Sequence, residues 1–132
     1  MRTAMTAAFV IAIALPAAAH HSFSAEFDAN KVVTLDGQVV MMEWVNPHSW
    51  LYIDVKDESG KVSNWGVEMG SPNTLIRRGV TKNSVEVGTQ VTVDGYRAKD
   101  GSSTATGTTI KMPDGRQIFA NSQTGAPGGE RQ

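Results

Sequence analysis

The sequence contains no cysteine among its 132 residues. This absence excludes disulfide bonds, a thiol nucleophile, a thiolate metal site and a lipid anchor on an N-terminal cysteine. A folded domain in this chain must therefore be stabilised by its hydrophobic core alone. The length is sufficient for one small domain with such a core.

The sequence also lacks an excess of positive charge, because it has 12 lysines and arginines and 13 acidic residues. The formal net charge is −1 at neutral pH, and no cluster of basic residues stands out along the chain. Binding to nucleic acid needs several clustered lysines or arginines that contact phosphates. We therefore expect no nucleic-acid partner.

Long apolar runs are absent except at the N-terminus. Arg2 precedes the apolar run of residues 7–15, Pro16 ends this run, and alanines occupy 17–19. A positive residue, a short apolar run and small residues in this order are typical of a secretory signal peptide. The run is too short for a membrane anchor, so we expect cleavage of residues 1–19 and a periplasmic or secreted protein without a stable anchor.

Residues 20–31 form a short N-terminal segment, after which the pattern becomes that of β-strands. Apolar alternation and turn residues predict strands at 32–45, 49–56, 61–69, 89–99, 104–112 and 116–120. Gly37 lies near the middle of the long first run and suggests a bend or a bulge. Alternation puts Trp65 in the core and Trp50 nearer the surface. The tail 121–132 has almost nothing to bury, and we expect it to be disordered.

One stretch, residues 70–79, has the pattern of a short helix. Ser71 is placed to cap its N-terminus, with Pro72 at the first helical position. Gly79 can take the left-handed conformation that ends a helix. Leu75 and Ile76 are expected to face the core.

This order of strands, with one helix between the third and the fourth, predicts an all-β protein with one short helix. The expected fold is a small OB-fold-like barrel of five to six strands over residues 32–120. An open β-sandwich is the alternative. The position of the helix favours the barrel, because that fold places a helix at the bottom of the barrel at this point.

Four stretches of sequence resemble those of a known family. "HHSFSAEFD", "EWVNPHSW", "EMGSPNTLIRRG" and "VTVDGYRAKDGSS" together resemble a family of small exported bacterial proteins of unknown function. The resemblance extends over nearly all of the chain after the signal peptide. It implies export and a single domain, and it implies no activity, so function must be argued from the site.

The second and third expected strands carry a candidate binding face. Four residues on these strands point away from the expected core: Trp50, Tyr52, Asn64 and Glu68. The outer face of these strands is the usual binding surface of an OB-fold. Aromatic rings beside polar groups suit stacking on sugars or bases, or packing on a partner protein. Alternatively, Phe23 and Phe27 fold back and cover Trp50 and Tyr52.

The three histidines form a candidate metal site. Cleavage after Ala19 makes His20 the N-terminal residue, whose amine and imidazole can chelate Cu(II). His21 adds a second imidazole, and cleavage one residue earlier leaves Ala-His-His, which also chelates copper. His48 is the third histidine of the chain and a candidate distant ligand. Alternatively, the pair assists cleavage and His48 only caps a turn.

No pattern in the sequence indicates an enzyme. Four carboxylates lie on different expected strands without a local pairing motif: Glu43, Asp54, Glu68 and Asp94. The serines lack a nucleophile motif, and the glycines lack a phosphate-binding spacing. The sequence thus predicts a non-enzymatic exported binding module for an unknown small ligand or periplasmic protein. The alternative is a periplasmic copper-binding protein, in which Cu(II) is the one candidate cofactor and copper-dependent oxidation the one candidate chemistry.

We expect the mature protein to begin at His20, because Ala17 and Ala19 occupy the two positions that signal peptidase reads. N-terminal sequencing of protein purified from the periplasm measures this directly. A chain that begins at Met1, or at any residue beyond Ser22, would contradict both the cleavage site and the copper hypothesis.

Overall fold

The computed structural model describes residues 23–120, so the expected signal peptide, His20, His21 and the tail 121–132 lie outside the described part. The elements are α1 (Phe23–Glu26), β1 (Phe27–Glu43), β2 (Trp50–Lys56), β3 (Val62–Glu68), α2 (Pro72–Arg77), β4 (Gln90–Ala98), β5 (Thr104–Lys111) and β6 (Gln117–Phe119). Among residues 23–120, no helix has the length and apolar character needed to cross a membrane.

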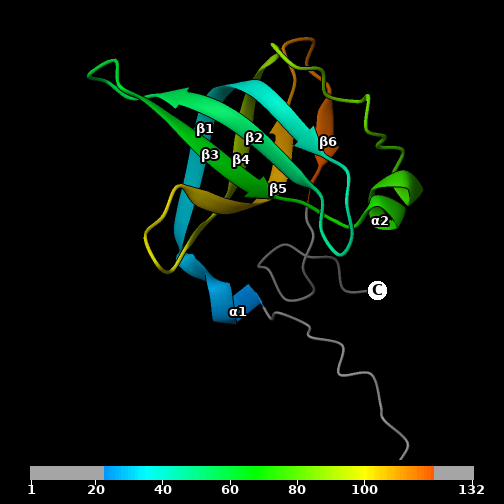
Figure 1. Ribbon diagram of the computed structural model, residues 1–132, viewed down its shortest axis with the longest axis horizontal. Coiled ribbons are helices and arrows are strands. Elements are labelled where there is room, and N and C mark those ends of the chain that lie inside the picture. The colour runs from blue at the N-terminus through cyan, green and yellow to red at the C-terminus, as the bar shows by residue number, and fades with distance from the viewer. Residues whose placement is uncertain (1–22, 121–132) are drawn as a thin grey trace, which may run out of the picture.

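The six strands form one sheet in the order β3-β2-β1-β4-β5-β6 (Figure 1). A parallel pairing between β3 and β5 joins the sheet into a ring, whereas the other neighbouring strands pair antiparallel. The prediction of an all-β, OB-like and barrel-like fold is confirmed. The described residues contain two short helices instead of the one expected, because α1 precedes the first strand.

The long strand β1 pairs along both of its edges. Its first part pairs with β4 and its last part with β2, and Gly37 pairs with both Val55 of β2 and Val91 of β4. A Cβ atom at Gly37 would lie 2.8 Å from the carbonyl oxygen of Asp54. A glycine is therefore required where β1 passes from one partner to the other. The expected irregularity in this strand lies slightly further on, at Val40, where the register with β2 shifts.

The N-terminal segment packs on β4. Phe27 is already part of β1 and pairs with Ala98, so the strand begins well before the expected start at Val32. The ring of Phe23 contacts Tyr96 edge-on, with ring centroids 5.3 Å apart. The alternative in which both phenylalanines cover Trp50 and Tyr52 is not the arrangement observed, because Phe23 and Phe27 pack with Tyr96 and Ala98 of β4.

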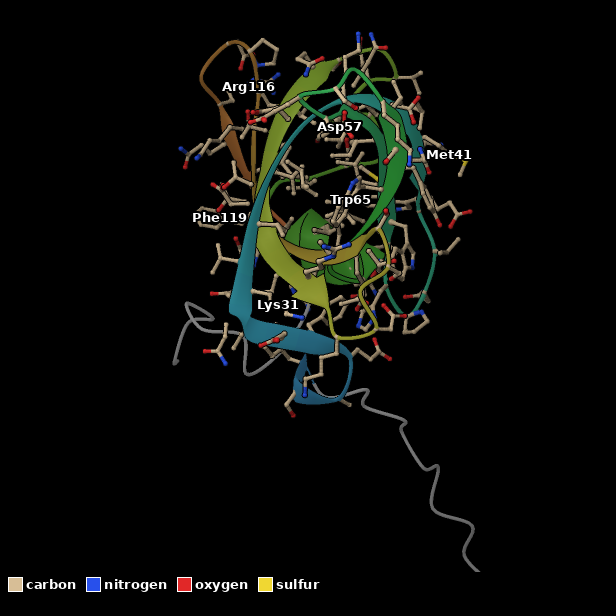
Figure 2. All side chains as sticks on the ribbon, turned by 90° about the vertical axis from the view of Figure 1, so that its left-hand side faces the viewer. Lys31, Met41, Asp57, Trp65, Arg116 and Phe119 are labelled. Carbon is tan, nitrogen blue, oxygen red and sulfur yellow. The ribbon has the colours of Figure 1, made fainter. Side chains whose placement is uncertain are left out.

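The inward-facing side chains of the strands make up the main core. It includes Leu35, Val39, Leu51, Ile53, Val67, Met69, Leu75, Val91, Val93 and Ile110. Trp65 lies on the core side but is only partly buried, and the guanidinium of Arg97 lies 5.3 Å from the centroid of its ring. Figure 2 shows Trp65 inside the ring of strands and Met41 outside it. The expected side of Trp65 is thus correct, although its burial is incomplete.

The short helix α2 forms where the sequence predicts it. The backbone N–H of Thr74 donates to the hydroxyl of Ser71, and Gly79 ends the helix with a φ of +79°. Leu75 is fully buried, but Ile76 is 53% exposed, which contradicts the expectation that both face the core. Successive residues of a helix point about 100° apart, so a helix this short buries only one of them.

We expect Gly95→Ala to destabilise the protein by about 1–3 kcal/mol, because the new Cβ would lie 2.2 Å from the backbone oxygen of Thr106. Gly70→Ala is the matched control, since its nearest new contact is 3.4 Å from a side-chain atom of Leu75. Urea denaturation of the three proteins measures the difference. Equal stabilities of the two variants would show that the close approach of β4 and β5 is not a constraint.

Candidate functional site

Two aromatic rings lie side by side on the outer face of β2. Trp50 and Tyr52 are two residues apart in the strand, so their side chains emerge on the same face. Their ring centroids are 6.4 Å apart and their planes differ by 23°. Both residues are half-buried, as the sequence predicts for residues on the face opposite the core. The two rings are thus roughly parallel neighbours in a stacked arrangement.

A glycine on the neighbouring strand lies beneath the rings. Gly66 of β3 pairs in register with Tyr52. A Cβ atom at Gly66 would lie 3.4 Å from Cε1 of Tyr52 and 3.6 Å from Cε3 of Trp50. Both rings therefore reach over the glycine, where a larger side chain would compete for their space. We call Trp50, Tyr52 and Gly66 the aromatic platform.

A carboxylate borders the platform on the other side of β2. Glu43 of β1 pairs in register with Trp50, and its Oε2 accepts a hydrogen bond of 3.3 Å from the hydroxyl of Tyr52. Burial, followed by the negative charge of Glu43 and this hydrogen bond, raises the pKa of the Tyr52 hydroxyl. The hydroxyl of Tyr52 therefore remains a protonated donor to Glu43.

The two polar residues expected on this face have different environments. Asn64 is exposed, and its side-chain amide donates to Oδ1 of Asp54 at 2.8 Å. Glu68 is only 2% exposed, which contradicts the expectation of an open side chain. The reason is its position in the ring, since Glu68 pairs with Trp50 of β2 on one side and with Thr106 of β5 on the other.

His48 binds to the buried carboxylate of Glu68. It lies in the connection between β1 and β2, which contains a cis peptide bond between Asn46 and Pro47. Its Nδ1 atom is 2.7 Å from Oε1 of Glu68, and its side chain is 26% exposed. In the part of the chain from 23 to 120, no three His, Asp or Glu side chains are grouped so that they could hold a metal ion.

A hollow of about 430 Å³ adjoins Trp50. Its lining comes from α1, the start of β1, the start of β2, the end of β4, the β4–β5 connection and the start of β5: Ala25, Glu26, Phe27, Trp50, Ala98, Lys99, Asp100, Ser102 and Thr104. Phe27 and Trp50 are its large apolar residues, two alanines add smaller apolar surface, and the remaining residues carry charged or hydroxyl groups.

Apart from Trp50 and Phe27, the lining of this hollow was not predicted from the sequence. The β4–β5 connection reads only as a turn, and it meets α1 because the backbone N–H of Lys99 donates to the carbonyl oxygen of Glu26 at 2.8 Å. The ammonium group of Lys99 also donates to the carbonyl oxygen of Ser24. The "YRAKDGSS" stretch was the one available signal, and nothing local indicates what it contacts.

The fold and this surface define a small OB-like protein with an aromatic platform on its outer face. The chain belongs to a family of unknown function, DUF6152, whose profile matches residues 7–109. This match confirms the resemblance noted in the sequence. No curated protein and no solved structure matches the chain.

Proposed function

We propose that the protein is an exported, non-enzymatic binding module whose ligand site is the aromatic platform together with the adjoining hollow. The observation that carries this proposal is the position of Trp50, which belongs to both. One side chain thus belongs both to the aromatic pair and to a concave surface. The N-terminal pattern of the sequence supports export, to the periplasm or beyond.

The size and composition of the hollow suit a small ligand. Ligand pockets commonly occupy a few hundred cubic ångströms and combine apolar walls with a few polar groups. Here Phe27, Trp50 and Ala98 supply apolar surface, whereas Ser102 and Thr104 supply hydroxyls. Tyrosine and tryptophan provide large contact areas at low cost in conformational entropy. The same surface would also accept a group that projects from a partner protein.

The polar groups near the platform are engaged with one another, which supports binding instead of catalysis. Tyr52 bonds to Glu43, Asn64 bonds to Asp54, and His48 bonds to Glu68. The serine next to this histidine, Ser49, is fully buried, so its hydroxyl is closed to a substrate.

A screen of small fragments by two-dimensional ¹H–¹⁵N NMR on the mature protein tests this proposal. We expect the bound fragments to shift the amide signals of Trp50, Tyr52 and Ser102. Trp50→Ala should abolish these shifts, whereas Val87→Ala, a change at an exposed apolar residue outside the site, should preserve them. Fragments that shift only signals around Arg116, which borders two other hollows, would refute the assignment of this site.

A second candidate function is binding of Cu(II) by His48 together with the N-terminal His20. The observation that favours it is the 2.7 Å contact of His48 Nδ1 with Glu68. Histidines that bind metals commonly donate their other ring N–H to a carboxylate, which fixes the orientation of the ring. This contact would leave Nε2 of His48 as the coordinating nitrogen.

The few residues between His20 and Phe23 are long enough to permit this site. Phe23 packs on Tyr96, and Tyr96, Thr106 and Glu68 are neighbours in register on β4, β5 and β3. Adjacent strands lie about 4.8 Å apart, so Glu68 is roughly 10 Å from Tyr96. Three residues of chain span at most about 10 Å. A chain that begins at His20 is therefore long enough to reach the neighbourhood of His48.

This second candidate is tested by comparing the copper affinity of three proteins. They are the mature protein, the mature protein with one extra N-terminal residue, and the His48→Ala variant. A terminal chelate predicts a large loss of affinity when one extra residue precedes His20, because the α-amine is then displaced. Participation of His48 predicts a further loss in His48→Ala. Isothermal titration with Cu(II) measures both, and equally weak binding by all three forms would refute the copper site.

A further inference from the structure

Two carboxylates flank the ring of Trp50 from both neighbouring strands. Trp50 pairs in register with Glu43 of β1 on one side and with Glu68 of β3 on the other. Directly opposed residues in a sheet have Cβ atoms about 5 Å apart. The aromatic ring thus lies between two acidic side chains, which the sequence separates by 25 positions.

The charge of this face is predominantly negative. On the outer face of β2, β3 and the last part of β1, the described residues include three carboxylates: Glu43, Asp54 and Glu68. Lys56 is the cation of this face, and it lies at the opposite end of β2 from Trp50. Burial and, after it, the negative charge of Glu43 raise the pKa of the Tyr52 hydroxyl on this face.

The two flanking carboxylates differ in their access to a ligand. Glu68 is nearly completely buried and bonded to His48, so a ligand has no direct access to it. Glu43 is half-buried and bonded through one oxygen to Tyr52, so its other oxygen can contact a ligand directly.

We propose that this site selects small organic cations, with the positively charged group over Trp50 beside Glu43 and the apolar part of the ligand in the hollow against Phe27. This inference rests on the proposed binding function and specifies the class of its ligand. A cation over the face of a tryptophan is attracted by the ring, and tryptophan is the strongest of the aromatic residues in this respect. The nearby carboxylates add a favourable Coulomb interaction.

The same arrangement disfavours other ligands of an aromatic surface. Phosphate groups of single-stranded nucleic acid would be repelled by the acidic groups that border the rings. A neutral sugar would stack on the platform but would gain nothing from the negative potential. The volume of about 430 Å³ fits a small molecule, which is why we assign the site to a free organic cation.

Binding of choline and of its neutral isostere 3,3-dimethylbutan-1-ol to the mature protein tests the inference. The two compounds have nearly the same shape and differ in charge. We expect choline to bind about tenfold more tightly, as measured by NMR titration of the Trp50 and Tyr52 signals. Glu43→Gln should remove most of this difference, although the amide oxygen can still accept from Tyr52.

Glu58→Gln is the matched control, because Glu58 is an exposed carboxylate in the β2–β3 turn, at the far end of these strands. In Figure 1 this turn projects at the upper left, away from the start of β2. The control should preserve the preference for choline. Trp50→Ala should abolish binding of both compounds.

The possible outcomes separate this inference from the proposed function. Equal binding of choline and the neutral isostere would refute selection of cations while leaving the platform a binding site. Shifts of the same signals by oligothymidylate but not by choline would also refute it. If neither compound, nor any fragment of the screen, shifts these signals, both the inference and the proposed function are wrong.

Discussion

The pairing of β1 along both edges is the constraint on which the rest of the structure depends. This strand joins β4 through its first part and β2 through its last part, with Gly37 paired to both. The exchange is possible because glycine lets the backbone of Asp54 approach closely. The parallel pairing of β3 with β5 then joins the two parts into one ring.

The ring also creates the site. Because β3 lies between β2 and β5 at Glu68, this carboxylate is buried, and it is bonded to a histidine from the β1–β2 connection. A lone buried carboxylate would be costly, and the histidine offsets that cost. The same registers place Trp50 between Glu43 and Glu68, so the two carboxylates beside the platform are a direct consequence of the strand pairing.

The sequence predicted the parts of the site that follow from alternation within one strand. Trp50 and Tyr52 lie on the outer face of β2, as expected, because residues two apart in a strand share a face. Asn64 is exposed on β3, also as expected. Phe27 was expected near Trp50, as a cover of its ring. Glu43 and the β4–β5 connection were not predicted as part of a site, since they meet Trp50 only through pairings between distant segments.

The amino-acid sequence by itself determined the strands, the helix cap at Ser71, the left-handed glycine at 79 and the order of elements that gives an OB-like fold. These features depend on local propensity and on periodicity, which a sequence displays directly. Only the tertiary structure decided that Phe23 packs on β4, that Glu68 is buried and that His48 is its partner. These contacts join residues far apart in the chain, and their partners are selected by strand register, which no local pattern specifies.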